Sequence, residues 1–403
     1  MIQKISIKNF KSVHSNEMEL GRFNVLIGEN GSGKSNILEA IAFGGAASAN
    51  LLSNEFLASR GIRVTQPELM FSAFSLISNI SKSKTRLEFV NDKKKVYKYE
   101  LVRQKREWAD NLLTTDAHYL AATFGILAEK IFGQEVKVES EEDELLDNKM
   151  KELKKGIKEN PLAFRRKITA IGKSIDNRTS NLKYISDLQT FIIYAPENTA
   201  LRNFFDEGQI TPLGIHGEGL FSLLKEISQE KKGNRFKKII ESLKIIDWFD
   251  GFELEANGFP GEKVIKIKDK YISDSIQYID QRSTNEGFLF LLFYITLFVS
   301  DKTPQFFAID NIEASFNPKL CTKLIQVLAK LAKEHKKQVI VTTHNPFILD
   351  GLNLADEDQR LFVVRRNMEG HTITNRIEPK TKTDVPLSEA WMRGYLGGLP
   401  NNF

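Results

Sequence analysis

The stretch that decides the fold is Gly28-Glu29-Asn30-Gly31-Ser32-Gly33-Lys34-Ser35. It fits G-x-x-x-x-G-K-[ST], in which the glycines let the backbone curl around a phosphate, the lysine reaches the outer phosphates and the hydroxyl binds Mg²⁺. A strand-like run at 22–27 precedes it, and apolar residues at helical spacing follow from Asn36. A chance glycine turn lacks these flanks. We therefore assign nucleotide contacts to Asn30, Gly31, Ser32, Gly33, Lys34 and Ser35.

Two later strands end in residues that suit the same site. Phe306-Phe307-Ala308-Ile309-Asp310 is an apolar run ending in a carboxylate, and beside a phosphate loop such an aspartate holds the metal. One strand later, His344 follows another apolar run, at the carboxyl end where parallel sheets bind ligands. The alternatives are a core strand that happens to end in Asp, and a capping or core histidine. We predict Mg²⁺ binding by Ser35 and Asp310, and a contact of His344 with the γ-phosphate or the attacking water.

The rest of the chain indicates an α/β fold. A hairpin is expected at 84–103, and further strands at 190–194, 251–256, 263–268, 305–309 and 338–343. Helices are expected within 217–248 and at 287–300 and 318–333, and a seam of apolar residues at helical spacing lies within 105–185. The strand–helix alternation favours a mostly parallel sheet. The fold class predicted is a P-loop NTPase, with a mixed sheet flanked by helices and a helical insertion.

Composition excludes several classes of protein. The 403 residues suggest two or three structural units, and 41% hydrophobic with 27% charged residues is typical of globular proteins and not of disordered ones. The longest apolar stretch, 287–299, is shorter than the roughly 20 residues that span a bilayer. Charged residues at the N-terminus argue against a secretory signal. The single cysteine, Cys321, forms no internal disulfide, so we expect a reducing, cytoplasmic location.

The loop, the aspartate and the histidine, in this order, resemble the ABC-type ATPase heads of the RecF, SMC and OLD families. The opening strand at 7–12 is similar to theirs, and Tyr194–Asn198 and Pro212–Leu220 are similar to segments of compact OLD-like ATPases. The resemblance covers 1–45 and 190–350. It makes 1–104 the first and 188–403 the second part of the head, whereas the helical insertion at 105–187 is inferred from its composition and periodicity.

The resemblance also implies ATP and Mg²⁺ as cofactors and a homodimer or higher oligomer. In such heads a signature segment of one protomer closes on the nucleotide of the other, and the matching residues are Ser283, Asn285 and Gly287. No paired glycines follow the serine, and an ordinary helix cap is the alternative. The segment 314–318 corresponds to one that meets the partner protomer. Gln66 is the candidate for a glutamine that senses the metal.

The chain departs from the family pattern after Asp310. Most members place a glutamate there to polarise the attacking water, whereas this chain has Asn311, whose amide cannot accept a proton as a carboxylate can. Glu313 is the nearest replacement. Three interpretations remain open: Glu313 acts as the base, His344 assists, or hydrolysis is slow and nucleotide binding is the signal.

The function implied is an ATPase that controls a separate effector, a nuclease or toxin, in bacterial defence against phage. Only 59 residues follow His344, which is too few for the nuclease domain of full-length OLD proteins. The alternatives are a nucleotide-locked scaffold with little hydrolysis and a RecF-like DNA-repair ATPase; a small-molecule kinase fits less well.

Nucleic acid is a further candidate partner. Residues 149–173 carry nine Lys and Arg against two Glu, and such a stretch can bind phosphates. The alternative is a solvated helix, paired with the acidic run at 139–144.

Overall fold

The structure is a computed structural model. It describes residues 1–49, 51–65, 67–72, 84–104, 107–110, 186–204, 212–230, 233–256, 263–273, 275–378 and 385–399. Within these ranges, no helix combines the length and the apolar character needed to cross a bilayer.

Six strands form the central sheet, in the order β14-β13-β3-β12-β11-β7. All pairings are parallel except that of β14 with β13, so the predicted mostly parallel sheet is confirmed. The run expected at 190–194 forms only a two-residue strand, because the chain leaves the sheet after Tyr194 and the Ala195 N–H bonds to the Ile215 carbonyl. The strands are β3 (Phe23–Ile27), β7 (Ile193–Tyr194), β11 (Phe306–Ile309), β12 (Gln338–Thr343), β13 (Gln359–Arg366) and β14 (Thr372–Ile377).

The central sheet separates two apolar cores, because successive residues of a strand point to opposite faces. In β3, Val25 and Ile27 belong to one core and Leu26 to the other. In β12, Val341 and Ile340 divide in the same way. These strands are therefore apolar along their whole length, as expected of parallel strands that are covered on both faces.

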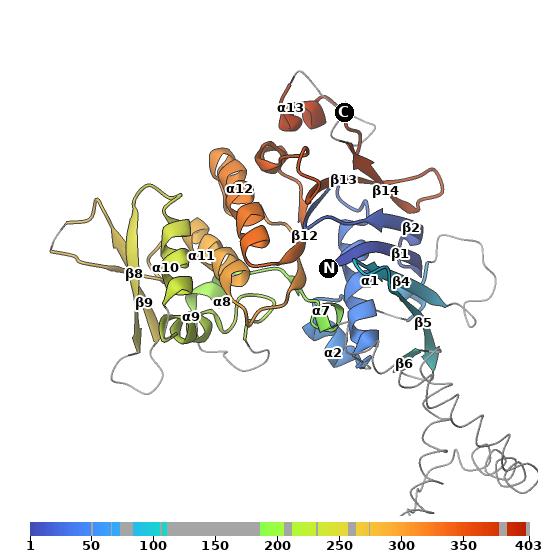
Figure 1. The fold of residues 1–403 in the computed structure, drawn as a ribbon, viewed down its shortest axis with the longest axis horizontal. Helices are drawn as coiled ribbons and strands as arrows, with labels where there is room; N and C mark the ends of the chain where they lie inside the picture. The colour runs from blue at the N-terminus through green and yellow to red at the C-terminus, as the bar shows by residue number, and fades with distance from the viewer. Residues whose placement is uncertain are drawn as a thin grey trace, which may run out of the picture.

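The helix α1 (Lys34–Ser48) and a second sheet cover one face of the central sheet (Figure 1). The second sheet is antiparallel, in the order β2-β1-β4-β5-β6. Its strands are β1 (Ile2–Phe10), β2 (Val13–Glu19), β4 (Thr85–Asn91), β5 (Val96–Gln104) and β6 (Glu107–Asp110). The hairpin predicted at 84–103 is confirmed by β4 and β5.

The expected start of the helical insertion is wrong. The sequence predicts helical structure from residue 105. Instead, β6 pairs with β5 and continues the antiparallel sheet through Asp110. Residues 111–185 of the expected insertion lie outside the described residues, and its last two residues begin a short helix that ends at Gln189.

The helices α11 (Glu286–Val299) and α12 (Pro318–Glu334) pack on the opposite face. Every residue of α11 from Phe288 to Val299 is buried, as expected of a helix that is apolar on all sides. Farther out lie α8 (Asn198–Arg202), α9 (Leu220–Ser228), α10 (Asn234–Leu243) and a small sheet of β8 (Phe249–Ala256), β9 (Lys263–Asp269) and β10 (Ile279–Asp280). The short helices are α2 (Asn54–Ser59), α3 (Pro67–Met70), α7 (Ser186–Gln189), η2 (Pro346–Gly351) and α13 (Leu387–Met392).

One buried side chain ties the two larger sheets together. The amide of Gln338, at the start of β12, accepts a hydrogen bond from the Ile2 N–H at 2.9 Å. Its Nε2 donates to the Ile2 carbonyl at 2.6 Å and to the Gly21 carbonyl at 2.9 Å. The Gly21 carbonyl also accepts from Asn24 Nδ2 at 3.0 Å, so the two Ile2 groups depend most on Gln338.

We expect Gln338→Leu to lower the free energy of unfolding by about 3 kcal/mol, because a buried polar group left unpaired costs about 1–3 kcal/mol. Urea denaturation followed by circular dichroism measures the change. Gln326→Leu, on the exposed side of α12, is the control and should stay within about 0.5 kcal/mol of wild type. A loss for Gln338→Leu no larger than that of the control would contradict the role of this side chain.

Candidate functional site

The predicted phosphate loop connects β3 to α1. Gly31 and Gly33 have φ of 78° and 104°, a region that favours glycine. Space restricts the glycines as well: a Cβ on Gly33 would lie 2.0 Å from the Thr372 hydroxyl oxygen, and one on Gly28 would lie 2.1 Å from the Val364 carbonyl oxygen. The loop therefore needs glycine, and it presents the N-terminus of α1, which favours an anion.

Residues far along the chain hold this loop in place. The Thr372 hydroxyl donates to the Ser32 carbonyl at 2.9 Å and lies 2.7 Å from the Ser12 hydroxyl. Arg366 Nε donates to the Gly31 carbonyl at 2.8 Å. Sequence patterns do not reveal these roles of Ser12, Arg366 and Thr372, because nothing local marks a polar residue of a hairpin as the neighbour of a loop some 340 positions away.

Lys34 lies over the loop. Its Nζ donates to the carbonyls of Gly28 at 2.9 Å and Glu29 at 3.0 Å. Burial lowers the pKa of Lys34 to about 8, against the opposing effect of Asp310, Glu313 and Glu29. The Ser32 hydroxyl is buried, and no described residue forms a hydrogen bond with it. An unpaired buried hydroxyl and a desolvated ammonium in one loop fit a bound phosphate group.

The two predicted metal ligands are in contact. The Ser35 hydroxyl donates to Asp310 Oδ2 at 2.9 Å, while Asp310 Oδ1 accepts from the Thr342 hydroxyl. Hard oxygen atoms of this kind are what Mg²⁺ prefers, usually together with substrate phosphates and water. Within the described ranges, no three His, Cys, Asp or Glu residues form a metal-binding group. The donor set therefore fits a magnesium ion that is completed by nucleotide oxygens.

Glu313 has one fixed and one free carboxylate oxygen. Oε1 accepts from the His344 backbone N–H at 2.7 Å, whereas Oε2 is buried and finds no partner in the part of the chain that the structure describes. Its charge acts on Lys34 and on His344, and it adds to the burial that raises the pKa of Tyr294. A carboxylate that is oriented at one oxygen and open at the other can accept a proton from a water molecule.

His344 lies at the same edge of the sheet as the loop. Burial lowers the pKa of its imidazole, and Lys34 lowers it further, while Glu313, Asp310 and a hydrogen bond to the Gly28 backbone act the other way. The imidazole is therefore neutral at pH 7. The structure thus brings together Lys34, Ser35, Asp310, Glu313 and His344 from three separate segments.

The signature-like segment lies elsewhere on the molecule. Asn285 caps α11, since its Oδ1 accepts from the Phe288 N–H at 2.8 Å, and this is the helix cap named as the alternative. The Ser283 N–H donates to Asp280 Oδ1 at 2.8 Å. A Cβ on Gly287 would lie 3.0 Å from the Ser315 carbonyl oxygen. Among the described residues, no hydrogen bond or ion pair joins Ser283, Asn285 or Gly287 to the phosphate loop. Their contact with a partner's nucleotide stays a prediction.

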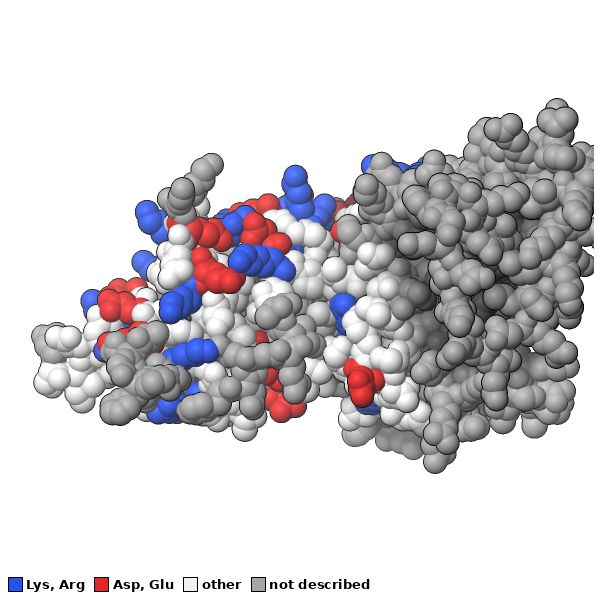
Figure 2. All heavy atoms as spheres, turned by 90° about the horizontal axis from the view of Figure 1, so that it is seen from below, with Lys and Arg blue, Asp and Glu red and all other residues white. Residues whose placement is uncertain are grey.

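Two other candidates fall outside the described residues: Gln66 and the basic stretch at 149–173, with the acidic run at 139–144. On the face shown in Figure 2, basic and acidic side chains intermingle over the part that carries β8 and β9. Ion pairs such as Lys268–Asp250, at 3.2 Å, account for this mixture. The described residues of that face therefore form no wholly basic patch.

Comparison with known proteins identifies the family. Residues 1–349 match the family described as the AAA ATPase domain. No curated protein matches the chain. Similar solved structures include the SMC head domain from Thermotoga maritima, at 15% identity and a TM-score of 0.44, covering 94% of this chain and 99% of that one. Another is the Smc head domain with a coiled coil and joint from Pyrococcus yayanosii, at 14% identity and a TM-score of 0.48, covering 97% and 99%. Because the family match spans residues 1–349, the chain belongs to the AAA ATPase domain family, and its α/β P-loop fold is the one predicted from the sequence.

Proposed function

We propose that the chain binds Mg-ATP at Gly28–Ser35 and hydrolyses it to ADP and phosphate, with Glu313 as the general base. The observation that carries this proposal is the buried, unpartnered Oε2 of Glu313, in a carboxylate whose other oxygen is fixed by His344. The same carboxylate is close enough to influence the pKa of Lys34, the residue expected at the outer phosphates.

The residues then have distinct roles. Lys34 and the loop backbone neutralise the phosphate charge, and Mg²⁺ held by Ser35 and Asp310 would draw charge from the phosphate oxygens. Glu313 takes one proton from a water molecule, whose oxygen forms a bond to the γ-phosphorus as the bond to the bridging oxygen of ADP breaks. The neutral imidazole of His344 is placed to orient that water or a γ-phosphate oxygen.

We infer further that two protomers associate head to tail and control a separate effector, as the resemblance to OLD-like ATPases of phage defence implies. Ser283 and Asn285 are exposed at the N-terminus of α11, where backbone N–H groups favour an anion. The Ser315 hydroxyl donates to Glu286, so the segment at 314–318 borders the same surface. Both segments line a cavity of about 710 Å³. This surface suits the nucleotide of a partner.

The second candidate function is a nucleotide-locked scaffold. Asn311, in the position usually held by a glutamate, is the observation that favours it. Single-turnover hydrolysis separates the two functions.

We expect Glu313→Gln to lower the rate of phosphate release in a single turnover by about 10²–10⁴-fold, the usual contribution of a general base. ATP affinity, measured by titration calorimetry, should change little because Lys34 and the loop are intact. Glu241→Gln, at an exposed site on α10, is the control and should keep the wild-type rate. Undiminished hydrolysis in Glu313→Gln would contradict the assignment of the base. ATP binding without hydrolysis in wild type would favour the scaffold.

We expect the affinity for ATP to fall roughly tenfold between pH 7 and pH 9. Lys34 of the free protein has a pKa of about 8, and bound phosphates raise it by favouring the charged form. Binding above pH 8 therefore requires proton uptake, and the affinity decreases as the pH rises. Calorimetry at constant ionic strength and Mg²⁺, in two buffers with different ionisation enthalpies, measures both the affinity and the uptake. A constant affinity across this range would contradict the role of Lys34.

We expect ATP to produce a dimer of the Glu313→Gln protein in sedimentation velocity, and Ser283→Glu to abolish it, because a carboxylate would then face the triphosphate of the partner. Asn285 is left unchanged so that the cap of α11 is retained. Ser228→Glu, on the exposed side of α9, is the control. Dimers that form equally well in Ser283→Glu would contradict the head-to-tail arrangement.

A further inference from the structure

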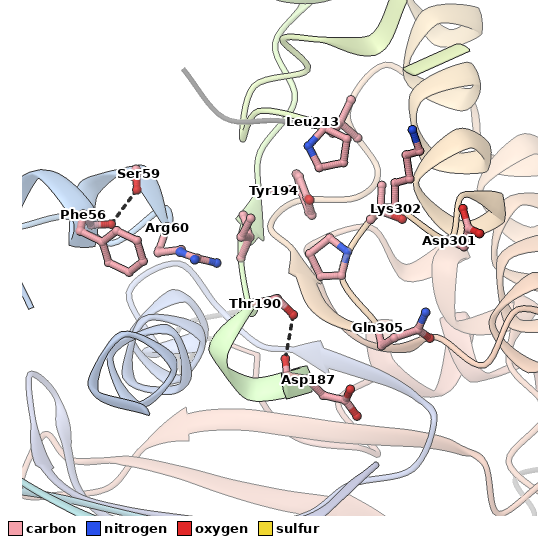
Figure 3. A pocket seen from close by; sticks show the side chains of 14 residues that line it. Phe56, Ser59, Arg60, Asp187, Thr190, Tyr194, Leu213, Asp301, Lys302 and Gln305 are labelled. Carbon is pink, nitrogen blue, oxygen red and sulfur yellow. Dashed lines mark hydrogen bonds between the residues drawn. The ribbon is translucent and has the colours of Figure 1, made fainter. Parts of the chain in front are cut away.

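A cavity of about 620 Å³ lies at the opposite end of the central sheet from the nucleotide site. Ile192 and Gln305, which line it, immediately precede β7 and β11, whereas Asp310 follows β11 at its carboxyl end. The volume is within the range of about 300–1,000 Å³ that is usual for small-molecule sites. Figure 3 shows its residues coming from α2 on one side and from the 301–305 loop on the other.

Arg60 is the charged side chain that this cavity offers to a ligand. Three other charged residues line the cavity and pair with groups outside the lining: Asp187 with the N-terminal amine at 3.8 Å, Asp301 with Arg235 at 2.7 Å and Lys302 with Glu226 at 2.6 Å. The Arg60 side chain reaches from the end of α2 toward β7 (Figure 3), and its guanidinium lies over the Phe56 ring, 4.6 Å from the ring centroid. One of its five N–H donors bonds to the Phe191 carbonyl at 3.3 Å. Burial lowers the pKa of Arg60. In the part of the chain that the structure describes, no carboxylate forms an ion pair with it.

Tyr194 supplies a second polar group without a partner. The side chain is fully buried and lines the cavity, and its hydroxyl has no hydrogen-bond partner among the described residues. Its ring is held edge-on by Phe293 and Phe307, at centroid distances of 5.8 and 5.9 Å. The buried hydroxyl and the partly buried guanidinium beside it are both hydrogen-bond donors. A single acceptor that carries negative charge would bind to both.

The rest of the wall combines polar residues, such as Thr190 and Gln305, with apolar ones, and part of it is firmly held. Ile192, Leu213 and Pro304 contribute apolar surface. Lys337, buried at the start of β12, donates to the Thr303 carbonyl at 2.8 Å and to the Pro304 carbonyl at 3.2 Å, which fixes the wall that contains these two residues. The cavity is therefore preformed, and it suits a ligand whose body is apolar or aromatic.

We propose that this cavity binds a small ligand with an anionic group and an apolar or aromatic body, the anion being held by the Arg60 guanidinium and the Tyr194 hydroxyl. The site also has a short path to the metal ligand, because the Tyr194 carbonyl accepts a hydrogen bond from the Asp310 N–H at 2.9 Å. A ligand that shifts Tyr194 thereby changes the nucleotide site. This coupling rests on the proposed ATPase function, whereas binding in the cavity does not.

Anilinonaphthalene sulfonate, an aromatic anion whose fluorescence rises on binding, is the probe. We expect saturable binding of one equivalent, weakened about tenfold in Arg60→Met, which keeps the stem that covers Phe56 and loses the charge. Tyr194→Phe removes only the unpaired hydroxyl, so it should fold normally and weaken binding severalfold. Arg86→Met, an exposed arginine on β4 paired with Glu100 at 3.0 Å, is the control and should bind as wild type does.

Hydrogen–deuterium exchange with the probe bound should show protection at 191–194 and 302–306. Equal affinity in wild type and Arg60→Met, or protection confined to other segments, would overturn the proposed site. Titration of ATP with and without the probe tests the coupling, which an unchanged ATP affinity would overturn. If ATP does not bind at all, the proposed ATPase function is wrong. The fluorescence titration then still tests whether the cavity binds an anionic ligand.

Discussion

The parallel pairing of β3, β12 and β11 is the constraint on which the site depends. Neighbouring strands lie about 4.8 Å apart, so the ends of three adjacent parallel strands fall within about 10 Å of one another. The register places Thr343 beside Ile27 and Ile309 beside Val341, which brings the phosphate loop, His344 and Asp310 to one edge. Three short segments that are distant in sequence meet because their strands are neighbours.

The position of Asn311 has a backbone explanation. Asn311 has φ of 54°, in the left-handed region that asparagine adopts more readily than glutamate does. Its N–H donates to the Thr342 hydroxyl at 2.9 Å, so the chain turns sharply after β11. This turn returns Glu313 to the His344 N–H. The asparagine that removes the usual carboxylate thus belongs to the turn that brings another carboxylate to the site.

The sequence predicted those parts of the site that adjoin strong local patterns. The loop, Asp310 and His344 each follow an apolar strand, and the structure places all of them at one edge. Glu313 was proposed only as the nearest carboxylate, and its hydrogen bond to His344 depends on a turn that local patterns do not reveal. Thr342 was missed because a threonine inside a buried strand looks like an ordinary core residue. Its partner, Asp310, lies on the neighbouring strand.

Strand pairing also explains where the fold predicted from the sequence was wrong. Glu107–Asp110 carries no alternation of apolar and polar residues, and it forms a strand because β5 offers an open edge beside it. The hydrogen bonds that hold the phosphate loop depend even more strongly on strand pairing. Arg366 and Thr372 are distant from the loop in sequence, and only the pairing of β13 with β3 brings their hairpin next to it.

That hairpin has a consequence for where the ATPase unit ends. The family match stops at residue 349, before Arg366 and Thr372. A chain shortened at this boundary would keep every recognised motif, yet it would lose both side chains that form hydrogen bonds with the loop. It would also turn β3 from an interior strand into an edge strand, since β13 is its neighbour on one side. An apolar strand with one edge open is a template for aggregation. We therefore expect the smallest stably folded unit to extend beyond the region that matches the family.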